Sequence, residues 1–218
     1  MTPPVVTVDG PAGAGKSSAS RALAARLGFA YVDTGAMYRA VGVLADEAGL
    51  DLDDDAALAR LVAGLRFDAV GERCVVGGRD LSSAIREPRA GELASRVSTR
   101  PVVRERLVAV QREVGARGGV VMEGRDIGTV VFPDAPVKLY LTATPAERAR
   151  RRAAELRARG EAVDEAALAH ELAARDARDS GRAHSPLRPA PDAIVVDTTA
   201  LSLDAVVERM LALVRART

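Results

Sequence analysis

The sequence has no tryptophan and a single cysteine, and aromatic residues make up only 3 % of it. Cys74 alone cannot form an intramolecular disulfide, which suits a reducing cytoplasm. So few aromatic rings leave little material for surfaces that stack nucleic-acid bases. The two histidines, His170 and His184, are isolated, so the sequence shows no metal-ligand spacing. These absences exclude a disulfide scaffold and a zinc site held by cysteine and histidine.

Excess charge and long apolar runs are lacking too. The 31 basic and 30 acidic residues give a net charge of +1, which offers no bulk attraction to nucleic acid or to a membrane. The N-terminus shows neither the basic segment nor the apolar run of a signal peptide or membrane span. We therefore expect a cytoplasmic protein without nucleic-acid or membrane partners. Since the sequence shows no exposed apolar stripe, we expect a monomer.

Lysine is scarce, because Lys16 and Lys138 are the only two lysines in the chain. Lys16 belongs to a run that fits the phosphate-binding pattern G-x-x-x-x-G-K-[ST], namely Gly10-Pro11-Ala12-Gly13-Ala14-Gly15-Lys16-Ser17. A predicted strand over residues 5–8 precedes the run and a predicted helix over 18–27 follows it, as the motif requires. A glycine-rich turn that ends by chance in Gly-Lys-Ser is the alternative.

Each residue type in this loop has a physical purpose. Glycines let the backbone bring its N–H groups close to phosphate oxygens, and the following helix adds positive potential. Lys16 can reach the β- and γ-phosphates of a nucleoside triphosphate, and the Ser17 hydroxyl can bind Mg²⁺. We expect ATP to bind residues 10–18, which include Ser18.

Apolar, β-branched segments alternate with helical patterns along the chain. Strands are predicted at 5–8, 30–32, 120–122, 137–141 and 193–196, with helices between them, which indicates an α/β fold with a doubly wound parallel sheet of about five strands and helices on both faces. Helices are predicted at 51–65, 89–97, 101–117, 145–159, 164–180 and 203–216. Residues 66–70, 74–76 and 79–81 predict a small inserted antiparallel sheet, with a turn at Gly71-Glu72.

Two short stretches combine turn and charged residues at strand ends. Thr34 follows the second strand and is predicted to cap the next helix, with Arg39 about one turn further on. Spacing alone favours equally a capped helix with a surface arginine and an anion pocket. Arg125 and Asp126 follow a buried strand between two glycines. Because ligands bind beyond the carboxyl ends of parallel strands, a site role is favoured for this pair over a structural ion pair.

Arginine gathers in two later segments. The helix over 145–159 carries six arginines, which form either a mobile lid over phosphates or ordinary ion pairs such as Glu147–Arg151 and Glu155–Arg159. The excess of arginine over glutamate favours the lid slightly. The helix over 164–180 and the residues after it place Arg175, Asp179 and Arg182 on one face.

Several of these stretches together resemble the bacterial cytidylate kinases. The resemblance rests on the segment from Asp9 to Lys16, on Asp33-Thr34-Gly35-Ala36-Met37-Tyr38-Arg39, on Gly124-Arg125-Asp126-Ile127-Gly128-Thr129-Val130-Val131-Phe132-Pro133 and on Arg175-Asp176-Ala177-Arg178-Asp179 with Arg182. It covers nearly the whole chain. It implies a P-loop NTPase-type domain with a core at 1–38, 107–147 and 161–218, a nucleoside-monophosphate-binding insert at 39–106 and an arginine-rich lid at 148–160.

The resemblance also implies the reaction, which is transfer of the γ-phosphoryl group of ATP to CMP or dCMP with Mg²⁺. It implies catalytic roles for Lys16, Arg125, Arg178 and Arg182. It implies a CMP site formed by Thr34, Gly35, Arg39, Ser95, Arg104, Arg125, Asp126, Arg175, Asp179 and Arg182. Within that site Thr34, Arg39 and Arg125 contact the acceptor phosphate, and Ser95, Arg104 and Asp126 contact the cytosine edge. The role of Glu123, where the family often has aspartate, stays open.

Two other functions compete with this one. A kinase for a hydroxyl acceptor such as shikimate needs a carboxylate base, for which Asp33 is available, but the long insert and the Arg175–Arg182 cluster favour a nucleotide acceptor. A guanine-binding switch normally carries an Asn-Lys-x-Asp motif, and neither lysine lies in one.

Overall fold

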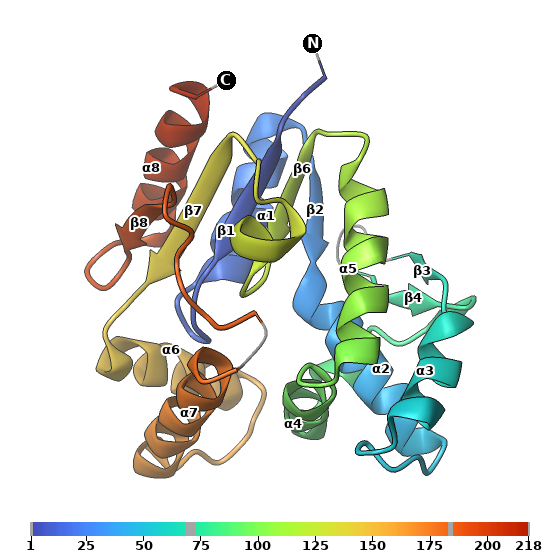
Figure 1. Ribbon diagram of the computed structural model, residues 1–218. Helices are drawn as coiled ribbons and strands as arrows, with labels where there is room; N and C mark the ends of the chain where they lie inside the picture. The colour runs from blue at the N-terminus through green and yellow to red at the C-terminus, as the bar shows by residue number, and fades with distance from the viewer. Residues whose placement is uncertain (1, 69–72, 183–184, 218) are drawn as a thin grey trace.

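A computed structural model describes residues 2–68, 73–182 and 185–217. Its main sheet is parallel and has the strand order β2-β6-β1-β7-β8 (Figure 1). The strands are β1 (Val5–Asp9), β2 (Ala30–Asp33), β6 (Val120–Glu123), β7 (Val137–Thr142) and β8 (Ile194–Asp197). All five predicted strands and the parallel α/β fold are confirmed. The carboxyl ends of these strands share one edge of the sheet, and the motifs described above lie there.

Helices cover both faces of the sheet because successive strand residues point to opposite sides. On one face, α1 (Lys16–Leu27) and α8 (Leu203–Arg215) pack over Val121 of β6. On the other face, α2 (Thr34–Glu47) and α5 (Pro101–Gly115) pack over the neighbouring residue Met122. The sheet therefore holds two hydrophobic cores, and its polar groups are concentrated at the strand ends.

The segment between α2 and α5 makes up most of the insert that the sequence predicts at 39–106. It contains α3 (Asp55–Ala63), a three-stranded antiparallel sheet, the short η1 (Ala84–Arg86) and α4 (Pro88–Val97). The strands are β3 (Phe67–Asp68), β4 (Val75–Val76) and β5 (Arg79–Asp80). The predicted helix over 51–65 is thus shorter, because Asp54 caps it from outside. The last two residues of the first predicted strand, 69 and 70, and the turn at 71–72 lie outside the described residues.

Cys74 lies directly before β4 and is 1 % exposed, as expected for a small buried residue. Burial raises the pKa of its thiol to about 11, so the reactive thiolate is scarce at neutral pH. His184, one of the two isolated histidines, lies outside the described residues.

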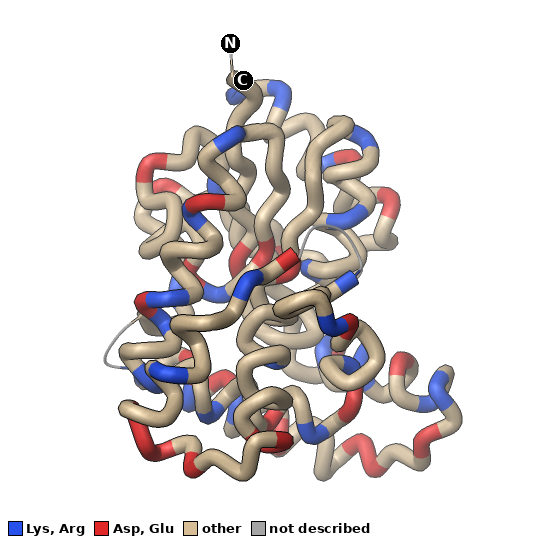
Figure 2. The backbone as a smooth tube through the Cα atoms, turned by 90° about the vertical axis from the view of Figure 1, so that its right-hand side faces the viewer, with Lys and Arg blue, Asp and Glu red and all other residues tan. Residues whose placement is uncertain are grey.

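Two helices, α6 (Pro145–Ala158) and α7 (Glu165–Ser180), pack against each other beyond the ends of β7 and β8 (Figure 1). Helices α2, α3 and α4 occupy the other side of the same end of the molecule. Between β6 and β7 the chain makes a short π-helical turn, η2 (Ile127–Val131). Basic and acidic residues are interspersed over the side view in Figure 2. Within the described residues, no helix combines the length and apolarity needed to cross a membrane.

Candidate active site

The loop between β1 and α1 has the backbone that its glycines allow. Gly13 and Gly15 adopt φ values of 75° and 81°, which side chains with a Cβ adopt rarely. At Gly10 a Cβ would lie 2.0 Å from the carbonyl oxygen of Leu141, so only glycine fits. Gly15 is the N-cap of α1, and no side chain caps the helix there. The first N–H groups of α1 are therefore left without a side-chain acceptor, as in an anion-binding helix terminus.

Lys16 is the first residue of α1 and is buried. Its ammonium group donates to the carbonyl oxygen of Pro11 at 2.7 Å, within the same loop. Burial, helped by the positive charge of Arg125, lowers the Lys16 pKa to about 7. The negative charge of a bound triphosphate would favour the protonated form of Lys16 against burial and against the charge of Arg125. The loop therefore holds an ammonium group that anionic phosphates would stabilise.

Asp9, at the end of β1, was not predicted as a site residue. Its carboxylate accepts from the backbone N–H groups of Ile127 and Gly128, at 2.9 and 2.8 Å. Burial raises its pKa to about 6 in spite of these two bonds. The contacts fix the turn after β6 against the start of the phosphate loop, and so position Arg125 and Asp126. The only sequence signal was an acidic residue directly before the glycine motif.

Asp33, not Thr34, caps helix α2, so the predicted N-cap was wrong. The Asp33 carboxylate accepts from the N–H of Ala36 at 3.1 Å and pairs with Arg39 at 2.6 Å. The Thr34 hydroxyl instead donates to the carbonyl oxygen of Glu123 at 2.8 Å. The cap shifts by one residue because a neighbouring strand end supplies Thr34 with an acceptor. Helix α2 and β6 are thereby joined at the site.

Glu123 is 2 % exposed at the end of β6. Its Oε1 accepts a hydrogen bond from the Tyr31 hydroxyl, while its Oε2 is buried without a partner among the described residues. Burial and the nearby Asp33 charge raise its pKa, and the positive charge of Lys16 opposes the rise. The carboxyl therefore lies against the start of α1, next to the phosphate loop.

A network of buried charges connects the turn after β6 with α5 and α7. Arg104 of α5 pairs with Asp126, and both side chains are 8 % exposed. Arg125 donates to Asp179 of α7 at 3.2 Å, and Arg182 pairs with the same carboxylate. These contacts bring together residues from three distant parts of the sequence.

Further arginines crowd this network. Burial, followed by the charge of Arg125, lowers the Arg175 pKa to about 10. The charges of Arg39 and Arg182 act in the same direction on Arg175. Buried N–H groups of Arg175 and Arg182, the Nε of each, have no hydrogen-bond partner within the described residues. Positive charge concentrated in this way, with donors still unused, is suited to a polyanionic ligand.

Arg178, for which the resemblance implies a catalytic role, does not join this network. It is exposed on α7, and the described residues provide it with no hydrogen bond or ion pair. Ser95 of α4 is buried near the network, and its carbonyl oxygen accepts from Ser98 at 3.0 Å. Ser98, which also contacts Arg182, is a residue that sequence reasoning missed.

The arginines of α6 are all paired with carboxylates in this structure. The two predicted i,i+4 pairs, Glu147–Arg151 and Glu155–Arg159, are both present, at 2.8 Å for the first. Arg148 is buried, donates to the carbonyl oxygen of Ala12 at 3.1 Å and pairs with Asp176 at 2.6 Å. Helix α6 thus packs directly on the phosphate loop. The remaining pairs are Arg150–Glu147, Arg152–Glu155 and Arg157–Glu165.

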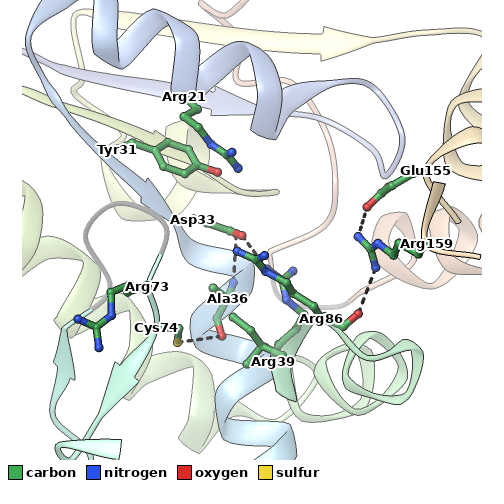
Figure 3. A pocket seen from close by; sticks show the side chains of 11 residues that line it. Arg21, Tyr31, Asp33, Ala36, Arg39, Arg73, Cys74, Arg86, Glu155 and Arg159 are labelled. Atoms are coloured by element: carbon green, nitrogen blue, oxygen red, sulfur yellow. Dashed lines mark hydrogen bonds and ion pairs between the residues drawn. The ribbon is translucent and has the colours of Figure 1, made fainter. Parts of the chain in front are cut away.

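A cavity of about 330 Å³ lies at the end of β2, between α1, the insert and the end of α6 (Figure 3). Asp33 and Arg39 lie together in its centre, and Arg159 donates to the carbonyl oxygen of Arg86 at 3.3 Å across one side. Arginines supply five of its eleven lining residues: Arg21, Arg39, Arg73, Arg86 and Arg159. These arginines line a path from the start of α2 toward the end of α6.

Comparison with known proteins agrees with this geometry. A model of the family described as cytidylate kinase matches residues 6–216. The curated cytidylate kinase of Syntrophotalea carbinolica is 49 % identical over 217 residues, covering 98 % of this chain and 92 % of that protein. The cytidylate kinase of Pelotomaculum thermopropionicum is 50 % identical over 218 residues, covering 98 % and 96 %.

Among solved structures, a gluconokinase from Sinorhizobium meliloti 1021 matches 99 % of this chain and 94 % of its own with a TM-score of 0.52. At 18 % identity, this likeness concerns the fold alone. The family match and the two relatives extend over the phosphate loop, the insert and the arginine network alike. The chain belongs to the cytidylate kinase family.

Proposed function

We propose that the residues described above carry out the reaction of this family, in which the γ-phosphoryl group of ATP passes to CMP or dCMP. The chain is a nucleoside monophosphate kinase, and its products are ADP and CDP or dCDP. One observation supports the assignment of the site most directly. The Asp9 carboxylate, directly before the phosphate loop, accepts from the backbone N–H groups of Ile127 and Gly128 at 2.9 and 2.8 Å, so the loop lies against the turn that carries Arg125 and Asp126.

The acceptor oxygen of a nucleoside monophosphate is already anionic near neutral pH, so the reaction needs no general base. The enzyme must hold two polyanions in line and neutralise the charge between them. Residues 10–18 bind the phosphates of ATP through backbone N–H groups and Lys16. Thr34, Gly35 and Arg39 at the start of α2, together with Arg125, bind the acceptor phosphate.

Base selection falls to Asp126, Arg104 and Ser95. The Asp126 carboxylate can accept from the exocyclic amine of cytosine, whereas uracil would present a carbonyl to it and leave both acceptors unpaired. Arg104 holds that carboxylate in place through the buried ion pair. Arg175, Asp179 and Arg182 complete the acceptor site on the α7 side, and Arg182 acts on the transferred group. Arg178 stays a prediction from the sequence for this last role.

The residues near the phosphate loop fit a magnesium ion. Mg²⁺ prefers oxygen ligands and usually keeps water and substrate phosphates among them. The Ser17 hydroxyl offers such an oxygen. The buried Oε2 of Glu123 has no partner among the described residues, and its carboxyl lies near enough to Lys16 for the charge of that residue to affect its pKa. The described residues contain no group of three or more acidic, histidine or cysteine side chains that could hold a metal by themselves. When bound with ATP, the ion would neutralise phosphate charge.

Domain movement belongs to the proposal as well. The insert at 39–106 and the lid at 148–160 would close over the nucleotides and exclude water, which limits futile hydrolysis of ATP. Monomeric state and cytoplasmic location stay predictions from the sequence.

The experiment is a coupled assay for ADP release with the purified protein and ATP. CMP, dCMP, UMP, AMP, GMP and shikimate are supplied in turn, and one reaction has no acceptor. CMP and dCMP are expected to give the fastest release, and Lys16→Met is expected to abolish it. Fast release with shikimate, or release that does not depend on any acceptor, would contradict the proposal.

A further inference from the structure

Ser98 occupies a position that links two arginines of the acceptor site. It is the C-cap of α4 and is buried. Its hydroxyl accepts a hydrogen bond from the Nη2 of Arg182 at 2.9 Å, and its backbone carbonyl oxygen accepts from the Nη1 of Arg104 at 3.4 Å. One residue of the insert therefore supplies acceptors to arginines from α5 and from the segment after α7.

The polarity of the Ser98 hydroxyl is fixed by its other bond. A serine hydroxyl has one hydrogen and two lone pairs, and a guanidinium group can only donate. Ser98 uses its hydrogen to donate to the carbonyl oxygen of Ser95 at 3.0 Å. The Ser98 oxygen must therefore act as the acceptor toward Arg182. The hydrogen bonds thus run one way, from Arg182 to Ser98 and from Ser98 to Ser95.

Arg182 needs such an acceptor because of its surroundings. Burial and the charges of Arg104 and Arg125 all lower its pKa, and Asp179 opposes them. Its contacts among the described residues are the bonds of Nη2 to Asp179 and Ser98, while its Nε is buried without a partner. A guanidinium repelled by its neighbours will keep one orientation only if acceptors on more than one side hold it. Asp179 lies three residues before it, and Ser98 comes from the insert.

We propose that Ser98 is a positioning residue that orients Arg182 for the acceptor nucleotide before the nucleotide binds. The inference rests on the proposed function, in which Arg182 contacts CMP and the transferred phosphoryl group. Ser98 itself touches neither reacting atom. Because its contact belongs to the acceptor side of the site, its loss should affect the use of CMP and spare the binding of ATP.

The test compares Ser98→Ala with the parent enzyme in steady-state assays. Since a hydrogen bond to a charged group is lost, kcat/KM for CMP is expected to fall roughly 10- to 100-fold, with KM for ATP unchanged. Thr99→Ala is the matched control. Thr99 also donates to a carbonyl three residues back, that of Arg96 at 2.7 Å, but it is exposed, and within the described residues no hydrogen bond joins it to an arginine side chain. Its kinetics should equal those of the parent.

Two conservative variants separate positioning from a structural role. Ser98→Thr keeps the hydroxyl and should restore most of the activity with CMP. Ser98→Cys keeps the shape of the side chain, with a slightly larger sulfur, but replaces the oxygen with a weak acceptor, so it should lose as much activity as Ser98→Ala. This second variant also tests the proposal if the alanine protein folds poorly.

A double-mutant cycle gives the decisive comparison. In an Arg182→Lys background, Ser98→Ala should change kcat/KM for CMP less than about 2-fold, because the guanidinium that it orients is gone. The inference would be overturned if Ser98→Ala lowered kcat/KM for CMP as much in the Arg182→Lys background as in the parent. It would also be overturned if kcat/KM fell equally for CMP and for ATP, or if Ser98→Ala kept the kinetics of the parent. A parent enzyme that leaves CMP unphosphorylated would instead refute the proposed function.

Discussion

Replacement of Asp126 by asparagine should change the base preference of the enzyme. Alanine is a poor probe here, because it would leave the buried Arg104 without its ion-pair partner, at a cost of about 3–5 kcal/mol in folding free energy. Asparagine keeps the shape of aspartate and an acceptor for Arg104. Its amide nitrogen then faces the base, where it opposes the cytosine amine and can donate to the uracil carbonyl.

The size of the change follows from the charge on the lost acceptor. A hydrogen bond to a charged group contributes about 1.5–3 kcal/mol, so the ratio of kcat/KM for CMP over UMP should fall by roughly 10- to 100-fold. The assay is the ADP-release assay with each nucleotide. Thermal unfolding is measured in parallel, and Asp134→Asn, a change at an exposed aspartate, serves as the control. A folded Asp126→Asn enzyme with the parental CMP/UMP ratio would refute the assignment of Asp126 to the base.

The raised pKa of Asp9, about 6 against 3.8, stabilises the fold below pH 3.8, and this contribution is lost as pH rises through 6. Between pH 4 and 7, the free energy of unfolding of the parent should therefore fall by about 3 kcal/mol relative to that of Asp9→Asn, as measured by urea unfolding. A difference between the two proteins that stays constant with pH would contradict this. Ser17→Ala should need on the order of 10-fold more Mg²⁺ for half-maximal rate, and an unchanged magnesium titration would exclude Ser17 as a ligand. Arg125→Ala should lower kcat by about 10³-fold with a folded protein by circular dichroism, and a loss below about 10-fold would remove it from catalysis.

The elements of this fold carry strong local signals. The β-branched runs, the glycine loop and the helical periodicity each lie within a few consecutive residues, so the sequence predicts the parallel sheet and its order of helices and strands. The pairs Glu147–Arg151 and Glu155–Arg159 were predictable for the same reason, since i and i+4 meet on any helix.

The contacts that shape the site are long-range, and a pattern of neighbours does not contain them. Asp9 meets Ile127 across 118 positions, and Tyr31 meets Glu123 across 92. The cap of α2 was assigned to Thr34 because Thr and Asp are both good N-caps, and only the fold shows that Glu123 takes the threonine hydroxyl. Ser98 had no signal at all, because its partner, Arg182, lies 84 residues away.

A crystal structure with CMP and a non-hydrolysable ATP analogue tests the central claim most directly. It should show the acceptor phosphate within hydrogen-bond distance of Arg39, Arg125 and Arg182, with the triphosphate on residues 10–18 and the Lys16 ammonium between the two nucleotides. A CMP phosphate bound away from these arginines, or a triphosphate outside the loop, would contradict the account.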